Sequence, residues 1–283
     1  MDNKEEQIIL QVQKLFAGAD ERNWKKVKSV MHEQVLLDYS SMTGNPAKTL
    51  TPQDICDAWS QFLPGFDRTN HVLSQFNVEA NDKEALVRYF GKADHYLGGE
   101  LWTVDGSYET RLICKSGGWL IQSQTFKFEK QDGEAKLAGK AIERTQLAVL
   151  REQNKALVNQ FFEALETQDF EILKEIFAED AKQLNPYSPE GFPKSFDGAE
   201  AIYKQYSGLT ANFGQMKFPR EIMATENPNF IFVKFKGQIQ IKSGGKYEND
   251  YLGTFLVAKG KIVEYTEYFN QIVMAKAFNI ELK

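Results

Sequence analysis

The sequence has little of what marks metal-binding, secreted, membrane or nucleic-acid-binding proteins. Its two cysteines, Cys56 and Cys114, lie far apart without metal-ligand spacing, so we expect two buried, reduced thiols. No apolar run approaches the ~20 residues that span a bilayer, and the first residues lack the basic and apolar regions of a secretory signal. The net charge is −5 without a Lys/Arg cluster, which argues against a nucleic-acid partner. These absences predict a cytoplasmic protein.

The chain is long enough for two domains, and an internal repeat supports that number. With 283 residues, 42% hydrophobic and 26% charged, it has an ordinary globular composition. A shift of 146 residues places Phe16 on Phe162 and Val27 on Leu173 in two amphipathic helix patterns. The same shift places the strand-like segment 85–96 on 231–242. Helices and strands that recur in the same order indicate a duplicated domain.

Each repeat predicts an α+β domain in which helices pack on one face of an antiparallel sheet. We expect a long first helix, a short strand and a second helix, which Thr51 opens in the first repeat and Asp197 in the second. The expected longer strands are residues 72–80, 83–96, 108–115 and 118–129, then 217–224, 230–241, 247–258 and 261–273. The polar segment 131–145 contains two glycines and reads as a linker between domains 1–130 and 146–283.

Three residues of the first repeat are suited to proton chemistry. Asp20 follows the apolar stripe of the first helix, His71 precedes a strand, and His95 ends one. On that strand, Tyr89 and His95 share a face because side chains alternate. An aspartate paired with a histidine fixes its tautomer and makes it a competent general base. The same three residues also fit purely structural roles. We assign no role to His32.

The whole chain resembles two SnoaL-like domains of the nuclear transport factor 2-like superfamily, which are cone-shaped α+β barrels. The first repeat is similar to the scytalone dehydratase branch in "LDYSS" around Tyr39, "TNH" at His71, "ADHY" at His95 and "GGWLI" on the last strand. The resemblance implies that His95, oriented by Asp20, is the base, that His71 assists, and that Tyr39 polarises a carbonyl. It implies neither a metal nor an organic cofactor.

Two departures from the dehydratase pattern argue against its own substrate. Ala19 stands where that branch has a second tyrosine, and Gly106 and Tyr108 stand near its polar third-strand residues. A small hydrophobic cyclic ligand remains the expected partner. The candidate cavity walls, which also fit plain core packing, are Trp59, Phe62, Phe66, Phe90, Trp102 and Tyr108.

The second repeat has no histidine and therefore cannot carry out Asp–His chemistry. The 146-residue shift places Asp20 on Glu166, and His71 on Lys217 or Phe218. The segments 185–202 and 260–270 resemble the phenazine-biosynthesis A/B-type branch, which binds small cyclic molecules and sometimes uses a carboxylate as an acid. Glu264 and Glu267 are its candidates, and the copy is either a second site or a structural domain.

Two hypotheses follow. The chain is a cofactor-independent lyase or isomerase that moves a proton next to a carbonyl of a polyketide- or steroid-like compound, or it is a non-catalytic binding or scaffold protein. Because single domains of this superfamily pair through their sheets, we expect a pseudo-dimer within the chain and leave higher homo-oligomers open.

Overall fold

The computed structural model describes residues 3–281, and the chain divides into two compact units, Met1–Gln146 and Leu147–Lys283. Each unit has its own hydrophobic core, and the two cores share no residue: the first ends with Ala141 and the second begins with Val158. Within the described residues, no helix combines the length and apolar character that crossing a membrane requires.

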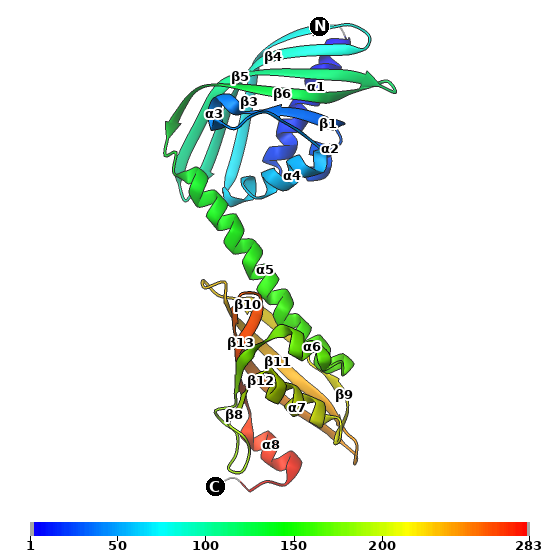
Figure 1. Ribbon diagram of the computed structural model, residues 1–283, viewed down its shortest axis with the longest axis vertical. Coiled ribbons are helices and arrows are strands. Elements are labelled where there is room, and N and C mark those ends of the chain that lie inside the picture. The colour runs from blue at the N-terminus through cyan, green and yellow to red at the C-terminus, as the bar shows by residue number, and fades with distance from the viewer. Residues whose placement is uncertain (1–2, 282–283) are drawn as a thin grey trace. The chain divides into compact units, whose positions relative to one another are not determined.

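The first unit wraps one curled sheet around its helices (Figure 1). The sheet has the strand order β2-β1-β6-β5-β4-β3, in which only β1 and β6 run parallel. Its elements are α1 (Asn3–Asp20), α2 (Trp24–Lys28), β1 (Met31–Asp38), α3 (Ser40–Thr43), β2 (Lys48–Leu50), α4 (Pro52–Ser60), the 3-10 helix η1 (Leu63–Gly65), β3 (Arg68–Ala80), β4 (Glu84–Leu97), β5 (Glu100–Lys115) and β6 (Gly118–Gly133).

The second unit repeats this plan. Its sheet has the order β10-β11-β12-β13-β7-β8, β9 pairs with β11 beside it, and β7 and β13 form the parallel pair. Its elements are α5 (Leu137–Thr167), which begins in the first unit, α6 (Glu171–Ile176), β7 (Phe177–Leu184), β8 (Ser195–Asp197), α7 (Ala199–Leu209), β9 (Phe213–Lys217), β10 (Arg220–Ala224), β11 (Phe230–Ile241), β12 (Lys246–Ala258), β13 (Lys261–Phe269) and α8 (Gln271–Phe278). The predicted α+β fold of two tandem cones is confirmed.

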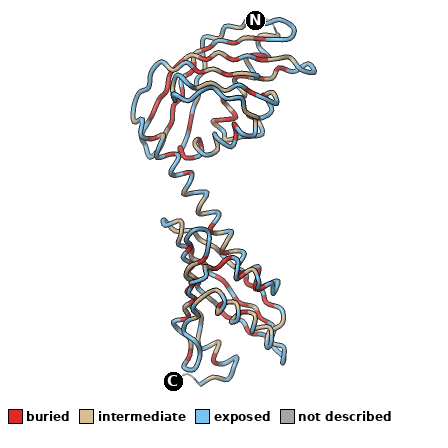
Figure 2. The backbone as a smooth tube through the Cα atoms, in the orientation of Figure 1, coloured by how far each residue is buried: buried red, intermediate tan, exposed pale blue. Residues whose placement is uncertain are grey.

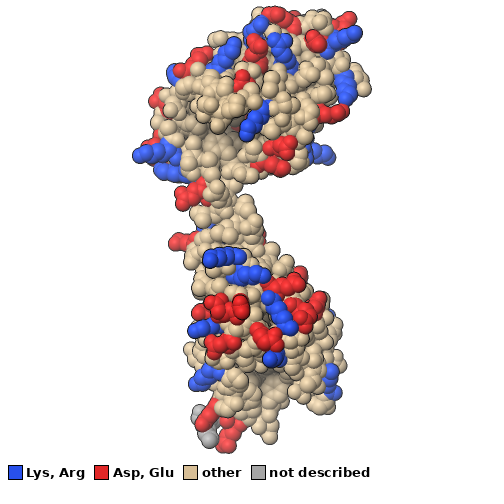
Figure 3. Space-filling model, viewed as in Figure 1, with Lys and Arg blue, Asp and Glu red and all other residues tan. Residues whose placement is uncertain are grey.

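The first core lies between α1 and the inner face of the sheet. In α1, Ile8, Val12, Leu15 and Phe16 are buried at helical spacing, and on β4 every second residue from Ala85 to Ala93 is buried. Figure 2 shows buried residues as red segments that recur along the strands and helices of this unit. Charged side chains lie on the outside, where both signs are interspersed on the face in view (Figure 3).

The predicted linker 131–145 is wrong. Strand β6 continues to Gly133, and α5 already begins at Leu137. Leu137 and Ala141, one helical turn apart, are fully buried in the first core, so the start of α5 belongs to the first unit. The polar residues around these two positions form the solvent side of an amphipathic helix, which composition alone does not distinguish from a linker.

Several predicted boundaries also differ. Thr51 caps α4 as expected, in a capping box with Asp54, but Gly198 rather than Asp197 is the N-cap of α7. The strand expected at 217–224 is divided into β9 and β10, because Pro219 offers no N–H to the ladder. The last strand ends at Phe269, since the side chain of Asn270 caps the new helix α8.

Candidate active site

Asp20 is the last residue of α1, a position at which the helix dipole disfavours a carboxylate. Three hydrogen bonds compensate. The Thr69 hydroxyl donates to Oδ1 at 2.8 Å, the His71 backbone N–H donates to Oδ2 at 2.8 Å, and His71 Nδ1 lies 2.7 Å from Oδ1. Burial opposes ionisation of Asp20, but the hydrogen bonds and charge of His71 outweigh it, so the pKa of this carboxyl lies below its usual value. Asp20 is therefore ionised at neutral pH.

The predicted pairing of Asp20 with His95 is wrong, because Asp20 hydrogen-bonds to His71 instead. Strand β3, which carries His71, contacts α1, whereas His95 lies one strand further on β4 and is paired with Thr69. His71 also presents its backbone N–H and its ring to the same carboxylate. Two contacts to one partner fix the ring orientation, and His71 Nε2 is left as the proton acceptor.

His95 is 5% exposed and lies inside the cone, as its alternation with Tyr89 predicted. Burial, together with the charge of His71, lowers its pKa to about 4, so the ring is neutral at neutral pH. Its Nδ1 lies 3.3 Å from the Trp102 carbonyl oxygen, which can only accept, so Nδ1 carries the proton and Nε2 is an acceptor. The rings of His71 and His95 stand edge to face with centroids 6.2 Å apart.

A second group of polar side chains lies deeper in the same cone. Tyr39 directly follows β1, and its hydroxyl accepts a hydrogen bond from Gln124 Nε2 at 2.9 Å. Tyr108 hydrogen-bonds to the same hydroxyl. Burial raises the pKa of Tyr39 to about 12, so it stays a neutral donor. Gln124 Oε1 is buried and has no hydrogen-bond partner among the described residues, so it can still accept a hydrogen bond.

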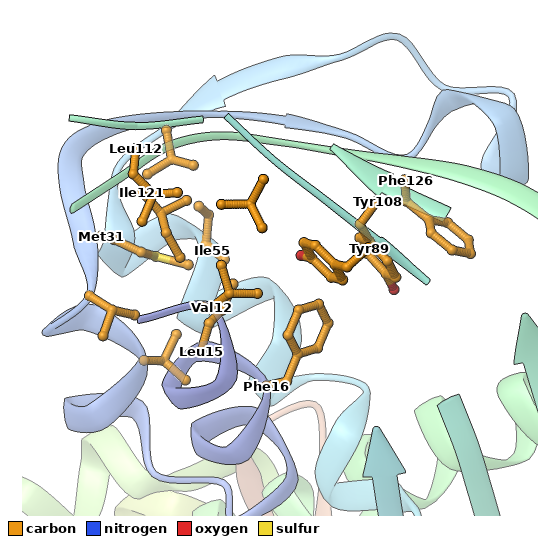
Figure 4. Close-up of a cluster of buried hydrophobic side chains, with 14 of the residues drawn as sticks. Val12, Leu15, Phe16, Met31, Ile55, Tyr89, Tyr108, Leu112, Ile121 and Phe126 are labelled. Atoms are coloured by element: carbon orange, nitrogen blue, oxygen red, sulfur yellow. The ribbon is translucent and has the colours of Figure 1, made fainter. Parts of the chain in front are cut away.

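Phe16 connects the two groups. Its ring centroid lies 5.0 Å from that of His71 and 5.2 Å from that of Tyr108. Tyr108 in turn stacks on Tyr89 with centroids 5.1 Å apart, and Figure 4 shows Phe16 beneath these two rings, with Phe126 beyond them. Phe16 therefore lies between the Asp20–His71 dyad and the group formed by Tyr39 and Tyr108.

Most of the aromatic residues predicted to line the cavity lie near His95, but Phe90 does not. Phe62, Phe66 and Trp102 surround His95, with ring centroids 6.1, 4.9 and 4.7 Å from it, and Trp59 is partly buried against the same core. Phe90 as a wall residue is wrong, because the alternation that turns Tyr89 inward turns Phe90 outward. Phe90 instead lines a pocket of about 260 Å³ on the outer face, at a bulge in β3.

In the second unit, a carboxylate occupies the position of Asp20 but has a different partner. Glu166 accepts the Phe218 backbone N–H at 2.7 Å, just as Asp20 accepts that of His71. The side-chain donor is Arg220, whose Nη1 lies 3.0 Å from Glu166 and whose guanidinium lies over Phe162 at 5.1 Å. Phe162 repeats the role of Phe16. An arginine remains charged at any physiological pH, so this pair cannot act as a base.

The two glutamates predicted for the second unit lie on opposite faces of β13. Glu267 faces the cone and accepts a hydrogen bond from the Tyr265 hydroxyl at 2.5 Å. Burial raises the pKa of Glu267 to about 7. Glu264 is three residues earlier and therefore points to the other face, where it is cross-strand from the exposed Leu256. Of the two glutamates, only Glu267 therefore faces the inside of the cone.

Comparison with known proteins agrees with this architecture. Models of the SnoaL-like domain match residues 3–125 and residues 158–265. The chain consists of two SnoaL-like domains in tandem. The YesE protein of Bacillus subtilis (strain 168) is 28% identical over 135 residues, a match that covers 43% of this chain and 91% of YesE.

Two solved structures to which this chain is similar each cover a little under half of it. One is a phenazine biosynthesis-related protein from Pseudomonas aeruginosa (TM-score 0.44, 23% identity, 48% of this chain and 86% of that one). Another, from Novosphingobium aromaticivorans, is assigned as a scytalone dehydratase (TM-score 0.40, 15% identity, 46% of this chain and 87% of that one). The predicted resemblance to tandem SnoaL-like domains is confirmed.

The sequence reasoning missed three residues of these sites: Thr69, Gln124 and Arg220. Thr69 has a usable signal, because it lies two residues before His71 and so shares its face. Gln124 is a polar residue at an inward position between Ile121 and Phe126, but bulges in the β5–β6 pairing shift the register and obscure it. Among the described residues, no group of three or more His, Cys, Asp or Glu could hold a metal ion.

Proposed function

We propose that the first SnoaL-like domain is a cofactor-independent lyase or isomerase that moves a proton next to a carbonyl of a small cyclic compound. The observation that carries this proposal is the 2.7 Å contact between Asp20 Oδ1 and His71 Nδ1. It makes His71 the base, with a free Nε2 and an adjacent carboxylate that stabilises the imidazolium. The His71 side chain is 13% exposed, in contrast to the enclosed His95.

In the proposed reaction, His71 Nε2 takes a proton from the carbon next to the substrate carbonyl, and the C–H electron pair forms an enolate. Tyr39, a neutral phenol that accepts hydrogen bonds from Gln124 and Tyr108, donates its own O–H to the developing oxyanion. The protonated His71 then gives its proton either to a leaving hydroxyl, which departs as water, or to another carbon, which completes an isomerisation. Neutral His95 accepts a hydrogen bond from a substrate hydroxyl through Nε2.

The first step can be tested without knowing the physiological substrate. The probe is 2-tetralone, a bicyclic ketone whose α-protons exchange with D₂O and are followed by NMR. We expect the full chain to accelerate exchange, and Asp20→Asn and His71→Gln each to reduce the enzymatic rate by about 10²- to 10⁴-fold. His32→Gln is the matched control and should leave the rate unchanged, because the hydrogen bonds of the His32 ring are with Gln34 of its own strand, away from Asp20 and His71.

One observation favours the alternative of a binding protein. His95 is enclosed by Phe62, Phe66 and Trp102, an environment that equally suits a packed core residue. If the protein binds 2-tetralone, but neither the wild type nor His71→Gln exchanges its protons above the buffer rate, the first domain is a binding module. Loss of exchange in the dyad variants with retained binding would instead establish the enzyme.

A further inference from the structure

The second cone contains a group of polar atoms that the chemistry of the first domain does not use. Gln183 and Tyr206 are 2% and 6% exposed, and Gln183 Oε1 and the Tyr206 hydroxyl are buried and make no hydrogen bond of standard geometry with the described residues, although the two side chains lie within reach of each other. The bond from Tyr265 is the only hydrogen bond that the described residues make to the Glu267 carboxylate. Three polar groups of one cone thus retain unused hydrogen-bonding capacity, which native interiors rarely leave.

These groups converge on one place. Gln183 on β7 is the cross-strand neighbour of Tyr265 on β13. Phe161 contacts both Tyr206 and Tyr265, with ring centroids 5.4 and 5.1 Å away. Burial raises the pKa of Tyr206 and of Tyr265, and the negative charge of Glu267 raises both further. This electrostatic effect indicates that both phenols lie near the carboxylate.

The free groups are mainly acceptors. Gln183 Oε1 is an amide oxygen and can only accept, while Nε2 of the same side chain donates to Asn185 Oδ1 at 3.3 Å. The carboxylate of Glu267 accepts, and a phenol oxygen can accept as well. The titratable groups whose pKa the charge of Glu267 raises are tyrosines of its own strand, of α7 and of β12, namely Tyr265, Tyr206, Tyr247 and Tyr251, and none of them carries a positive charge. A ligand that completes this set therefore needs N–H donors and a positive charge.

The carboxylate is specific to the second copy. In the first domain Leu37 pairs with Gln124, and at the corresponding place in the second domain Gln183 pairs with Tyr265. The residue two positions after Gln124 is Phe126, whereas the residue two positions after Tyr265 is Glu267. The remaining surroundings are flat aromatic rings, with Phe255 stacked on Tyr265 at 4.3 Å. Aromatic faces attract cations as well as apolar rings.

We propose that the second SnoaL-like domain binds a protonated amine carried on a flat ring, with Glu267 as the counter-charge and Gln183 and Tyr206 as further acceptors. The two domains then take chemically different ligands. This site does not depend on the Asp20–His71 dyad, so either proposal can fail without the other.

The probe for this site is benzylamine, tested by isothermal titration calorimetry with the full chain. Benzylamine remains protonated at pH 8 and at pH 6, while Glu267, with a pKa of about 7, loses most of its charge at the lower pH. We expect affinity to fall roughly tenfold from pH 8 to pH 6. Benzyl alcohol, the neutral analogue, should bind at least tenfold more weakly at pH 8.

Glu267→Gln should weaken benzylamine binding at least tenfold and abolish its pH dependence, and Tyr206→Phe should weaken it a few-fold. Glu264→Gln is the matched control, because this residue of the same strand faces the other side of the sheet and should bind as the wild type does. His71→Gln should also leave binding unchanged. Circular dichroism and thermal unfolding verify that each variant is folded.

The proposal is overturned if folded wild-type protein does not bind benzylamine at pH 8. It is equally overturned if Glu267→Gln binds as tightly as Glu264→Gln, or if benzyl alcohol matches benzylamine. A measured release of about one proton per benzylamine bound at pH 6, obtained from titrations in two buffers of different ionisation enthalpy, would support it.

Discussion

Asp20 binds His71 and not His95, through the backbone N–H of His71 as well as through its ring. The carboxylate accepts the N–H of His71 and its Nδ1 together, whereas His95 is held by the carbonyl of Trp102. The residue types Asp20, His71 and His95 were predictable from the sequence, because each lies near the end of its element. Which histidine accompanies Asp20 was not predictable. His71 and His95 lie on the adjacent strands β3 and β4, where Thr69 is the cross-strand neighbour of His95, so the answer depends on which of the two strands lies against the end of α1.

His95 makes the first domain sensitive to acid. Its pKa is lowered from 6.5 to about 4 in the folded state, so between these values the unfolded chain binds a proton that the folded chain does not. Stability is therefore full above pH 6.5 and falls as the pH drops towards 4, by about 3 kcal/mol for a shift of this size. Urea unfolding followed by tryptophan fluorescence measures it, because all four tryptophans lie in the first domain.

His95→Gln should remove most of that pH dependence, while His32→Gln should keep it. An equally steep loss of stability in His95→Gln and in the wild type would show that the buried ring is not the source.

At the scale of elements, glycines let aromatic rings lie across neighbouring strands. A Cβ on Gly91 of β4 would come 2.6 Å from the ring of Tyr108, which lies on β5. We expect Gly91→Ala to destabilise the first domain by about 1–3 kcal/mol, because ring or strand must shift. A Cβ on Gly139 of α5 would meet nothing within 4 Å, so Gly139→Ala should stabilise by about 0.5–1 kcal/mol. Thermal unfolding distinguishes the two, and equal effects would refute the crowding argument.

The start of α5 is a structural part of the first domain rather than a tether. Leu137 is fully buried in the same core as Ile8 and Phe66. We expect Leu137→Ala to cost about 2–5 kcal/mol of unfolding free energy, the range for a buried leucine. The exposed Ile142 provides the control, since Ile142→Ala should change stability far less. If urea unfolding shows a Leu137→Ala effect below about 1 kcal/mol, residues 137–145 would behave as the linker that their composition suggested.

A helix or strand could be predicted where the sequence carried its full pattern of alternation or capping residues, and not where the backbone departs from that pattern. The strand around Tyr89 alternates regularly, and α4 carries its full capping box, so both were found. The bulge in β3 was not, because Gln75 adopts a φ of 59° that no residue preference of glutamine announces. The break between β9 and β10 does have a signal in the sequence, because Pro219 has no backbone N–H to donate to the ladder.

At the scale of the whole molecule, duplication preserved the scaffold and changed the chemistry. Phe16 and Phe162, and Asp20 and Glu166, keep their places at a separation of 146 residues, whereas the donors to the two carboxylates are His71 and Arg220. Shifting the sequence by 146 residues aligns the phenylalanines and the carboxylates. It does not align the two side-chain donors, because Arg220 lies two residues after Phe218, the residue that corresponds to His71. The expected pairing of the two sheets stays a prediction.

Because each half has its own core, the fragments 1–146 and 147–283 should fold separately and respond oppositely to pH. In the second fragment, Glu267 has a pKa of about 7 against an ordinary value of 4.5, so the folded state holds a proton that the unfolded state releases between these values. Its stability should therefore fall as the pH rises from 4.5 to 7, by about 2 kcal/mol after allowance for the intermediate solvent exposure of Glu267.

Circular dichroism during urea unfolding measures both fragments, and Glu267→Gln should remove this slope from the second. The first fragment should instead gain stability over the same pH range, because His95 dominates its titration. Equal slopes of one sign in both fragments would mean that surface charge rather than these two buried groups controls the pH response. An unfolded fragment would mean that the cores are not independent.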